Sequence, residues 1–91
     1  MSDVQIIWDL EDDPEGNVVH CAEHDVSMEE AEEVLLGKDS ETDISRSSGE
    51  RITFGWTSTG RHLAVVWEHV QDDPLTMRPI TSYETPPKGG H

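Results

Sequence analysis

Cysteine, basic side chains and long apolar runs are all scarce in this chain of 91 residues. Its one cysteine excludes an intramolecular disulfide framework, so the fold must depend on packing. No window approaches the run of about 20 apolar residues that a membrane-spanning helix needs. The first residues, MSDVQIIWDLEDD, lack the basic and apolar segments of a signal peptide. We therefore expect a cytoplasmic protein that does not associate with a membrane.

Basic residues are far outnumbered, with six Lys and Arg against 20 Asp and Glu and a formal net charge of −14. Residues 1–50 hold 16 acids against Lys38 and Arg46, whereas residues 51–91 hold four acids and four bases. This balance argues against DNA binding, because phosphate recognition uses clustered lysine and arginine. Two interpretations of the acidic half stay open: a solubilising surface, or a face that docks on a basic protein.

The length fits one domain, which we place at residues 1–84, followed by a disordered tail at 85–91. Only 33% of the residues are apolar, so a few large side chains must supply much of the core. We expect Trp56 and Trp67 to pack beneath helices for this reason.

The first expected elements are a strand and a short helix. Residues 4–8 (VQIIW) are apolar and rich in β-branched side chains, which favours a strand. Asp13 followed by Pro14 is typical of a helix start, and the helix is expected to continue to about His24.

A second helix has a stronger start signal. Ser27, with Glu30 three positions later, predicts a capping box, and Gly37 is expected to end the helix at the position after its last turn. Between these limits the apolar residues share one face, with glutamates on the other. The apolar stripe consists of Met28, Ala31, Val34 and Leu35.

From about residue 41 the apolar period changes from 3.6 to 2, which predicts strands. The expected strands are 41–47, 51–57, 62–70 and 75–83. Alternation places Ile52, Phe54 and Trp56 on one face of their strand, and Leu63, Val65 and Trp67 on one face of the next. The order β-α-α-β-β-β-β predicts an α+β two-layer domain, with two N-terminal helices packed on an antiparallel sheet.

Four motifs between residues 6 and 84 then point to a family. They are WD at the end of the first strand, EHDVSMEEAEEVL, ERITFGWTSTGRHLAVVWE and MRPITSYE. In this order they resemble the BrnT toxins, which belong to the RelE-like superfamily of type II toxin–antitoxin systems. The resemblance implies a RelE-like fold, ribonuclease activity on mRNA, and a cognate antitoxin as partner.

Several positions can be matched to the family motifs one by one. Trp8 and Asp9 match WD and are candidate binding residues. Arg51 and Arg61 match the arginines of the family's ER and GR motifs, and Arg78 matches the first arginine of its RIISAR motif. The chain also departs from the family pattern, with Glu23 in place of a lysine, Asp25 in place of a glycine and Tyr83 in place of an arginine. Two alternatives follow: a ribonuclease, or a non-catalytic acidic interaction module on the same fold.

Cleavage of RNA needs a proton acceptor for the 2′-hydroxyl, a cation for the developing phosphorane and a proton donor for the leaving oxygen. The candidate cations are Arg51, Arg61 and Arg78. His62 or His69 can act as acid or base, and Tyr83 can donate a proton. The alternative is that the arginines balance the acidic half in surface ion pairs.

Two further groups have a chemical and a structural interpretation. His20, Cys21 and His24 lie on about one helical turn and would suit zinc, but no second Cys/His pair closes a site, so we expect no metal and no other cofactor. A zinc-binding regulatory protein stays the third hypothesis. Trp8 beside the arginines would suit base stacking if its ring is exposed.

Overall fold

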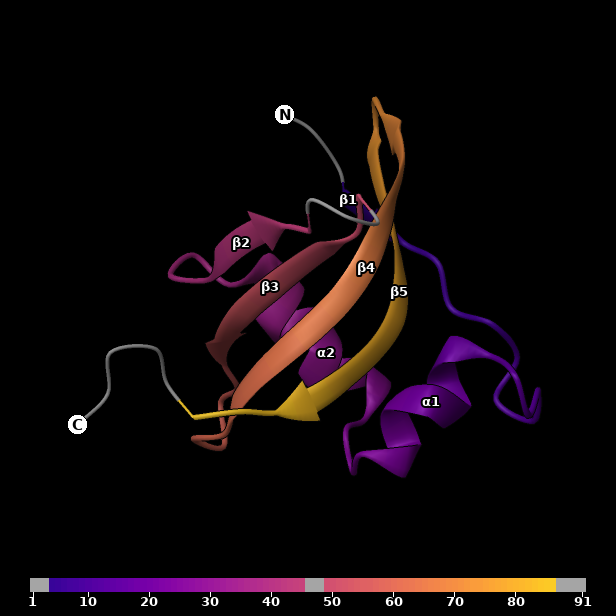
Figure 1. Cartoon of the computed structure of the whole chain (residues 1–91), viewed down its shortest axis with the longest axis horizontal. Helices are drawn as coiled ribbons and strands as arrows, with labels where there is room; N and C mark the ends of the chain where they lie inside the picture. Colours follow the sequence, from indigo (N-terminus) through magenta and orange to yellow (C-terminus); the bar gives the residue numbers. More distant parts are fainter. Residues whose placement is uncertain (1–3, 46–48, 87–91) are drawn as a thin grey trace.

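The computed structural model describes residues 4–45 and 49–86, and it confirms the α+β class and the expected order of elements (Figure 1). The elements are β1 (Val4–Ile6), α1 (Asn17–Glu23), α2 (Met28–Leu36), β2 (Glu41–Ile44), β3 (Arg51–Trp56), β4 (His62–Asp72) and β5 (Leu75–Glu84). Positions 46 and 47 of the expected 41–47 strand and positions 87–91 of the expected tail lie outside the described residues. Neither of the two helices in the described ranges is long and apolar enough to cross a membrane.

The five strands form one mixed sheet in the order β1-β5-β4-β3-β2. Strands β2 to β5 pair antiparallel in sequence order, but β1 pairs parallel to β5, with Val4 opposite Leu75 and Ile6 opposite Met77. The expectation of a purely antiparallel sheet is therefore wrong. A parallel pair needs a long connection, and here all the other elements lie between the two strands in the chain.

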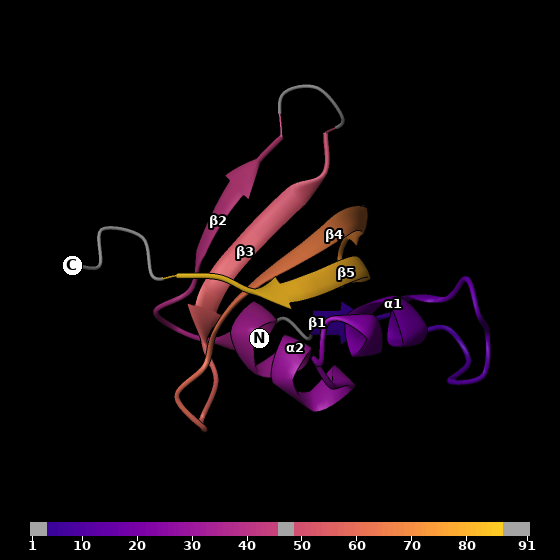
Figure 2. The same cartoon turned by 60° about the horizontal axis from the view of Figure 1, so that its bottom comes forward.

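Both helices lie on the same side of the sheet, as Figures 1 and 2 show from two directions. Helix α1 packs against β5, and α2 packs against β3 and β4. The core between the two layers consists of Cys21, Val26, Ala31, Val34, Leu35, Leu63, Val65, Trp67 and Met77. The expected burial of Trp67 is confirmed, and its Nε1 donates a hydrogen bond of 2.8 Å to Thr53 Oγ1.

The start of α2 is as predicted, whereas the start of α1 is not. The Glu30 backbone N–H donates to Ser27 Oγ and the Ser27 N–H donates to Glu30 Oε1, both at 3.1 Å, which completes the capping box. Helix α1 begins at Asn17, because Asp13 forms a turn instead of an N-cap. The Gly16 N–H donates to the Asp13 carbonyl, and the Glu15 N–H donates to the Asp13 carboxylate, both at 3.0 Å.

Gly37 ends α2, but in an extended conformation (φ −69°, ψ 139°) rather than the left-handed one that commonly follows a helix. Glycine is favoured here by space: a Cβ would lie 2.8 Å from Ser40 Oγ and 3.1 Å from the Glu33 carbonyl oxygen. The chain therefore turns tightly against the helix before it enters β2.

The expectation that Trp56 packs beneath the helices is wrong. Thr53 and Gly55 face α2, so Ile52, Phe54 and Trp56 point to the other side of the sheet. The reason is close packing: a Cβ on Gly55 would lie 3.3 Å from a methyl group of Val34 and would clash with Ser40 Oγ. Helix α2 can approach β3 only over small side chains, which leaves the large ones on the opposite face.

The buried side chain of Asn17, only 2% exposed, joins three segments that are distant in the sequence. Its Nδ2 donates to the carbonyl oxygens of Ile7 (3.0 Å) and Pro79 (2.8 Å), and its Oδ1 accepts from the Asp9 N–H (2.8 Å). The Asn17 backbone N–H donates in return to Asp9 Oδ2 (2.9 Å). These bonds hold the segment after β1, the start of α1 and the middle of β5 together.

We predict that Asn17→Ala lowers the free energy of unfolding by about 2–4 kcal/mol, because it removes three side-chain hydrogen bonds, one of them a buried bond to the Pro79 carbonyl. Urea denaturation followed by circular dichroism measures the loss. Glu23→Ala, on the exposed side of α1, is the control and should change stability by less than about 0.5 kcal/mol. Equal stability of Asn17→Ala and Glu23→Ala would contradict the assigned role.

Candidate functional site

The side of the sheet that faces away from both helices is here called the open face (Figure 2). Directly paired residues of antiparallel strands point to the same side, so the register assigns its members in three cross-strand rows. The rows are Asp43–Ile52–Val66–Thr81, Glu41–Phe54–Ala64–Tyr83 and Trp56–His62. The open face therefore combines apolar and aromatic side chains and one imidazole with two carboxylates on β2.

His62 lies at the centre of an aromatic group on this face. Its ring stacks on Phe54, with an interplanar angle of 9° and 6.5 Å between centroids, and meets Trp56 edge-on at 4.9 Å. Trp56 is 56% exposed although it is the bulkiest kind of apolar side chain. Aromatic side chains are enriched at binding interfaces relative to the rest of a protein surface, so this group is a candidate binding site.

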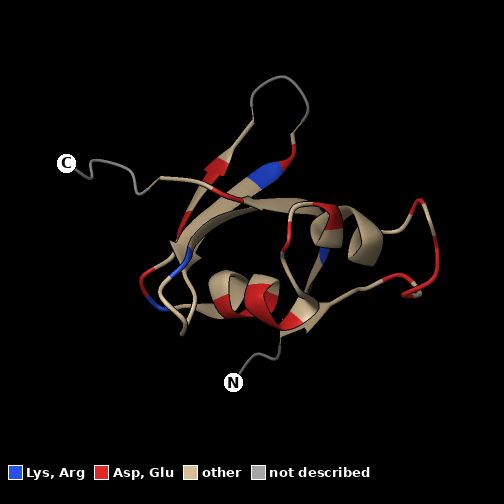
Figure 3. Cartoon of the chain, turned by 90° about the horizontal axis from the view of Figure 1, so that it is seen from below, with Lys and Arg blue, Asp and Glu red and all other residues tan. Residues whose placement is uncertain are grey.

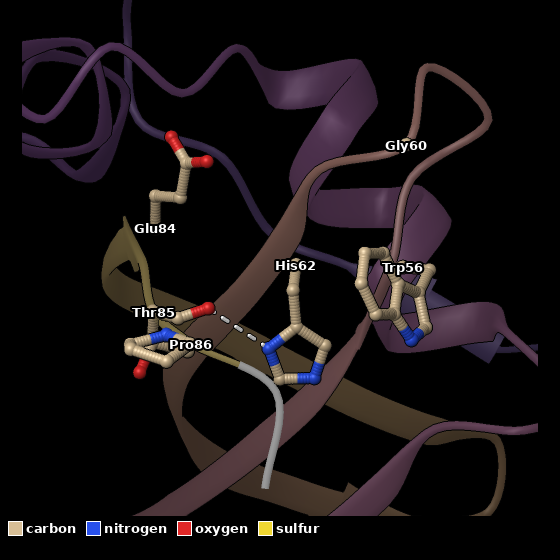
Figure 4. Close-up of a pocket in the computed structure, with 6 residues that line it drawn as sticks. All are labelled: Trp56, Gly60, His62, Glu84, Thr85 and Pro86. Carbon is tan, nitrogen blue, oxygen red and sulfur yellow. Dashed lines mark hydrogen bonds between the residues drawn. The ribbon is translucent and has the colours of Figure 1, made fainter. Parts of the chain in front are cut away.

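A hollow of about 360 Å³ surrounds the His62 imidazole (Figure 4). Its lining residues are Trp56, Gly60, His62, Glu84, Thr85 and Pro86. The imidazole lies between the Trp56 indole and the Thr85–Pro86 segment, whereas the Glu84 carboxylate turns away from it. Residues far apart in the sequence, from the start of β4 and from the end of β5, thus form one site.

The tautomer of neutral His62 follows from its hydrogen bond. Nδ1 lies 3.0 Å from the Thr85 carbonyl oxygen, which can only accept. Nδ1 therefore carries the proton, and Nε2 keeps a lone pair. An imidazole held in this way can accept a proton from a bound hydroxyl group or accept a hydrogen bond from a ligand.

Arg61, next to His62 in the sequence, points toward the helices. Its Nη1 donates to both carboxylate oxygens of Glu30 at 2.9 and 3.0 Å, and to the Asp25 carbonyl at 2.9 Å; its Nη2 contacts Glu84 at 3.4 Å. The pKa of Glu30 is lowered, chiefly by the Ser27 backbone N–H and further by Arg61. Arg61 thus fixes the β3–β4 turn to the beginning of α2.

The other two candidate arginines lie elsewhere. Arg78 contacts Asp9 at 2.9 Å and Glu68 at 3.9 Å, and the Arg51 guanidinium lies 5.5 Å from the centre of the Trp67 ring. The structure therefore does not bring the three arginines together, and none of them lines the hollow around His62. Their catalytic roles stay a prediction.

The remaining candidate residues are divided between the open face and the rest of the fold. Tyr83 lies on the open face and meets His24 edge-on at 6.2 Å. Trp8 is half-buried, and its Nε1 donates to Glu32 Oε2 at 2.8 Å; Asp9 belongs to the Asn17 network. His69 contacts Asp72 at 2.8 Å within the β4–β5 hairpin, and it does not line the hollow around His62.

The His20, Cys21 and His24 cluster does not converge on one point. Cys21 is fully buried in the core, and this burial raises the pKa of its thiol. His24 instead contacts Tyr83. Within residues 4–45 and 49–86, no three His, Cys, Asp or Glu side chains are placed to hold a metal ion.

Of the six residues that line the hollow, only His62 was predicted as a site residue. The other five are Trp56, Gly60, Glu84, Thr85 and Pro86. A signal for Trp56 exists in the sequence, because Gly55 interrupts an otherwise bulky strand. A glycine inside a strand often marks close approach by another segment, which places its two neighbours on the opposite side. Thr85 has no comparable signal, since its carbonyl acts through the backbone.

No protein-family model, no curated protein and no solved structure matches this chain.

We predict that Glu30 stabilises the fold in a pH-dependent way. Because its folded-state pKa lies below the unfolded value of about 4.3, its contribution is complete above that pH and is lost as the pH falls through the folded pKa. Glu30→Gln keeps an acceptor for Ser27 and removes the charge facing Arg61. The stability difference between wild type and Glu30→Gln should therefore shrink below about pH 4.

Urea denaturation at a series of pH values measures this difference. Glu29→Gln, one position earlier on α2, removes the same charge from a residue that has no contact with Arg61 among the hydrogen bonds and ion pairs of the described chain. A constant difference between wild type and Glu30→Gln from neutral to acidic pH would contradict the prediction.

Proposed function

We propose that this chain is a BrnT-like toxin homologue of a type II toxin–antitoxin system, and that the open face around His62 is its working surface. The geometry of His62 carries the proposal: a carbonyl fixes the ring, its Nε2 keeps a lone pair, and an exposed indole lies beside it. The sequence motifs that resemble BrnT toxins support the family part of the proposal.

RNA cleavage on this face uses three described side chains. Trp56 stacks on a base, which suits RNA of varied sequence because every base has a flat π surface. His62 Nε2 accepts the proton of the 2′-hydroxyl as this oxygen attacks the adjacent phosphorus. Tyr83, on the same face, donates a proton to the 5′ oxygen that leaves. The three candidate arginines do not line this site, so a partner or the solvent must supply the cation that stabilises the phosphorane.

The placement of the arginines favours a second candidate function. Arg61 and Arg78 each contact two carboxylates, and Arg51 lies over Trp67, so all three contribute to the fold. With a formal net charge of −14, the protein repels RNA at long range and attracts basic proteins. The second candidate is a non-catalytic interaction module that binds a basic partner, such as an antitoxin.

Tightly controlled expression in a bacterial host, with growth curves and mapping of new mRNA ends, distinguishes the two candidates. For the ribonuclease we predict growth arrest, and His62→Gln should slow cleavage about 100-fold or more, because general-base catalysis contributes at least that much. His69→Gln is the matched control, since it removes an imidazole that lies outside the hollow.

Normal growth with intact mRNA, from folded protein, would exclude the ribonuclease and leave the interaction module. Equal loss of cleavage in His62→Gln and His69→Gln would assign the effect to folding and would contradict the role of His62.

A further inference from the structure

A second concave surface lies on the other side of Trp56. The pairing of β2 with β3 ends at Glu41 opposite Phe54, so β3 has an unpaired edge beyond that point. There the Trp56 indole and one side of α2 line a groove of about 400 Å³. This α2–Trp56 groove is lined by Glu29, Glu32, Glu33, Leu36 and Trp56.

The apolar part of the groove is unusually exposed. Leu36 is 55% exposed and Trp56 is 56% exposed, and both line the same concavity. Leu36 follows Glu29, Glu32 and Glu33 on α2 at positions that share one helix face. Large exposed apolar side chains that border one groove are typical of a surface that binds another molecule.

Among the described residues, the polar side chains that line the groove are all carboxylates, those of Glu29, Glu32 and Glu33. Figure 3 shows that acidic residues colour much of α2 and the segment before α1. Two of these acids are held in place, since Glu32 accepts from Trp8 Nε1 at 2.8 Å and Glu33 accepts from the Ser58 N–H at 3.3 Å. Hydrogen bonds thus hold two of the three groove carboxylates, those of Glu32 and Glu33, in a groove that Trp56 also lines.

Arginine fits this combination better than any other side chain. Its aliphatic part can pack on Leu36, its flat guanidinium can stack on the Trp56 indole, and its N–H groups can pair with carboxylates in a bidentate way. Lysine offers a point charge without the flat surface, so the groove should prefer arginine.

We propose that the α2–Trp56 groove docks an arginine-rich segment of a basic protein partner. The negative charge that attracts such a partner comes from the whole acidic half of the chain, because residues 1–50 hold 16 acids against two bases. The proposal specifies the chemistry of the partner and does not depend on RNA cleavage, because only Trp56 is shared with the hollow around His62.

Fluorescence anisotropy with a short fluorescein-labelled arginine-rich peptide tests the proposal on the full chain. We expect saturable binding at about 0.1 M salt, and weaker binding of the matched peptides in which lysine or neutral glutamine replaces arginine. Leu36→Ser should weaken binding about tenfold, as should the double variant Glu29→Gln, Glu33→Gln. Glutamine retains the oxygen that accepts from Ser58, so the double variant keeps the local fold.

Matched controls separate the groove from general attraction to an acidic protein. The double variant Asp12→Asn, Glu15→Gln removes the same two charges at exposed positions ahead of α1, and Leu10→Ser removes an exposed leucine there. Both should change the dissociation constant less than about twofold. Equal weakening by the groove and control variants, or no saturable binding, would overturn the proposal.

His62→Gln removes only an edge-on contact with the Trp56 indole, so it should weaken peptide binding much less than Leu36→Ser. Peptide binding without growth arrest would support the groove and exclude the ribonuclease. Growth arrest without peptide binding would support the ribonuclease and exclude the groove as an arginine-binding site.

Discussion

The arrangement of this fold depends on one buried amide. Strand β1 lies at the edge of the sheet, and its described residues Val4–Ile6 pair with β5 alone, so no second neighbouring strand holds it in place. Asn17 supplies the missing connection, because its side chain bonds the chain just after β1 and the carbonyl of Pro79 in β5 at the same time. The constraint also explains why α1 begins at residue 17. An earlier start would move the amide away from the carbonyl groups that it satisfies.

Paired charges connect the acidic helical layer to the sheet. Arg61 joins the β3–β4 turn to Glu30 at the start of α2, and Arg78 joins β5 to Asp9. Arg61 and Glu30 are each only about one-fifth exposed, so water screens their attraction less than it would screen that of a fully exposed pair. A chain with few cations thus places two of them where they contribute to the fold, and these cations are not directed toward the hollow around His62.

The two sides of the sheet carry different kinds of side chain. The covered side is filled by the apolar core and by small residues that admit α2, whereas the open side presents aromatic rings and His62. Trp56 lies where the open face meets the unpaired edge of β3, and it borders both the hollow and the α2–Trp56 groove. Because Trp56 belongs to both surfaces, the roles of these surfaces are separated by variants of His62 and Leu36 and not by variants of the indole.

The sequence by itself determined the features that depend on near neighbours. The capping box at Ser27, the apolar stripe of α2 and the change of period near residue 41 involve residues within about four positions of each other. From them follow the α+β class and the order of elements. His62 and Tyr83 were also identified as site residues from sequence, and the structure places both on the open face.

Only the tertiary structure decided which side of β3 is covered, how β1 pairs and where α1 begins. Alternation shows that Ile52, Phe54 and Trp56 share one face of β3, and this face is apolar enough to belong to the core. Helix α2 nevertheless covers the other face, because Val34 packs closely against Gly55. The hydrogen bonds of Asn17 to Pro79 and of His62 to Thr85 involve backbone carbonyls, which every residue carries, so residue identity alone gives no indication of them.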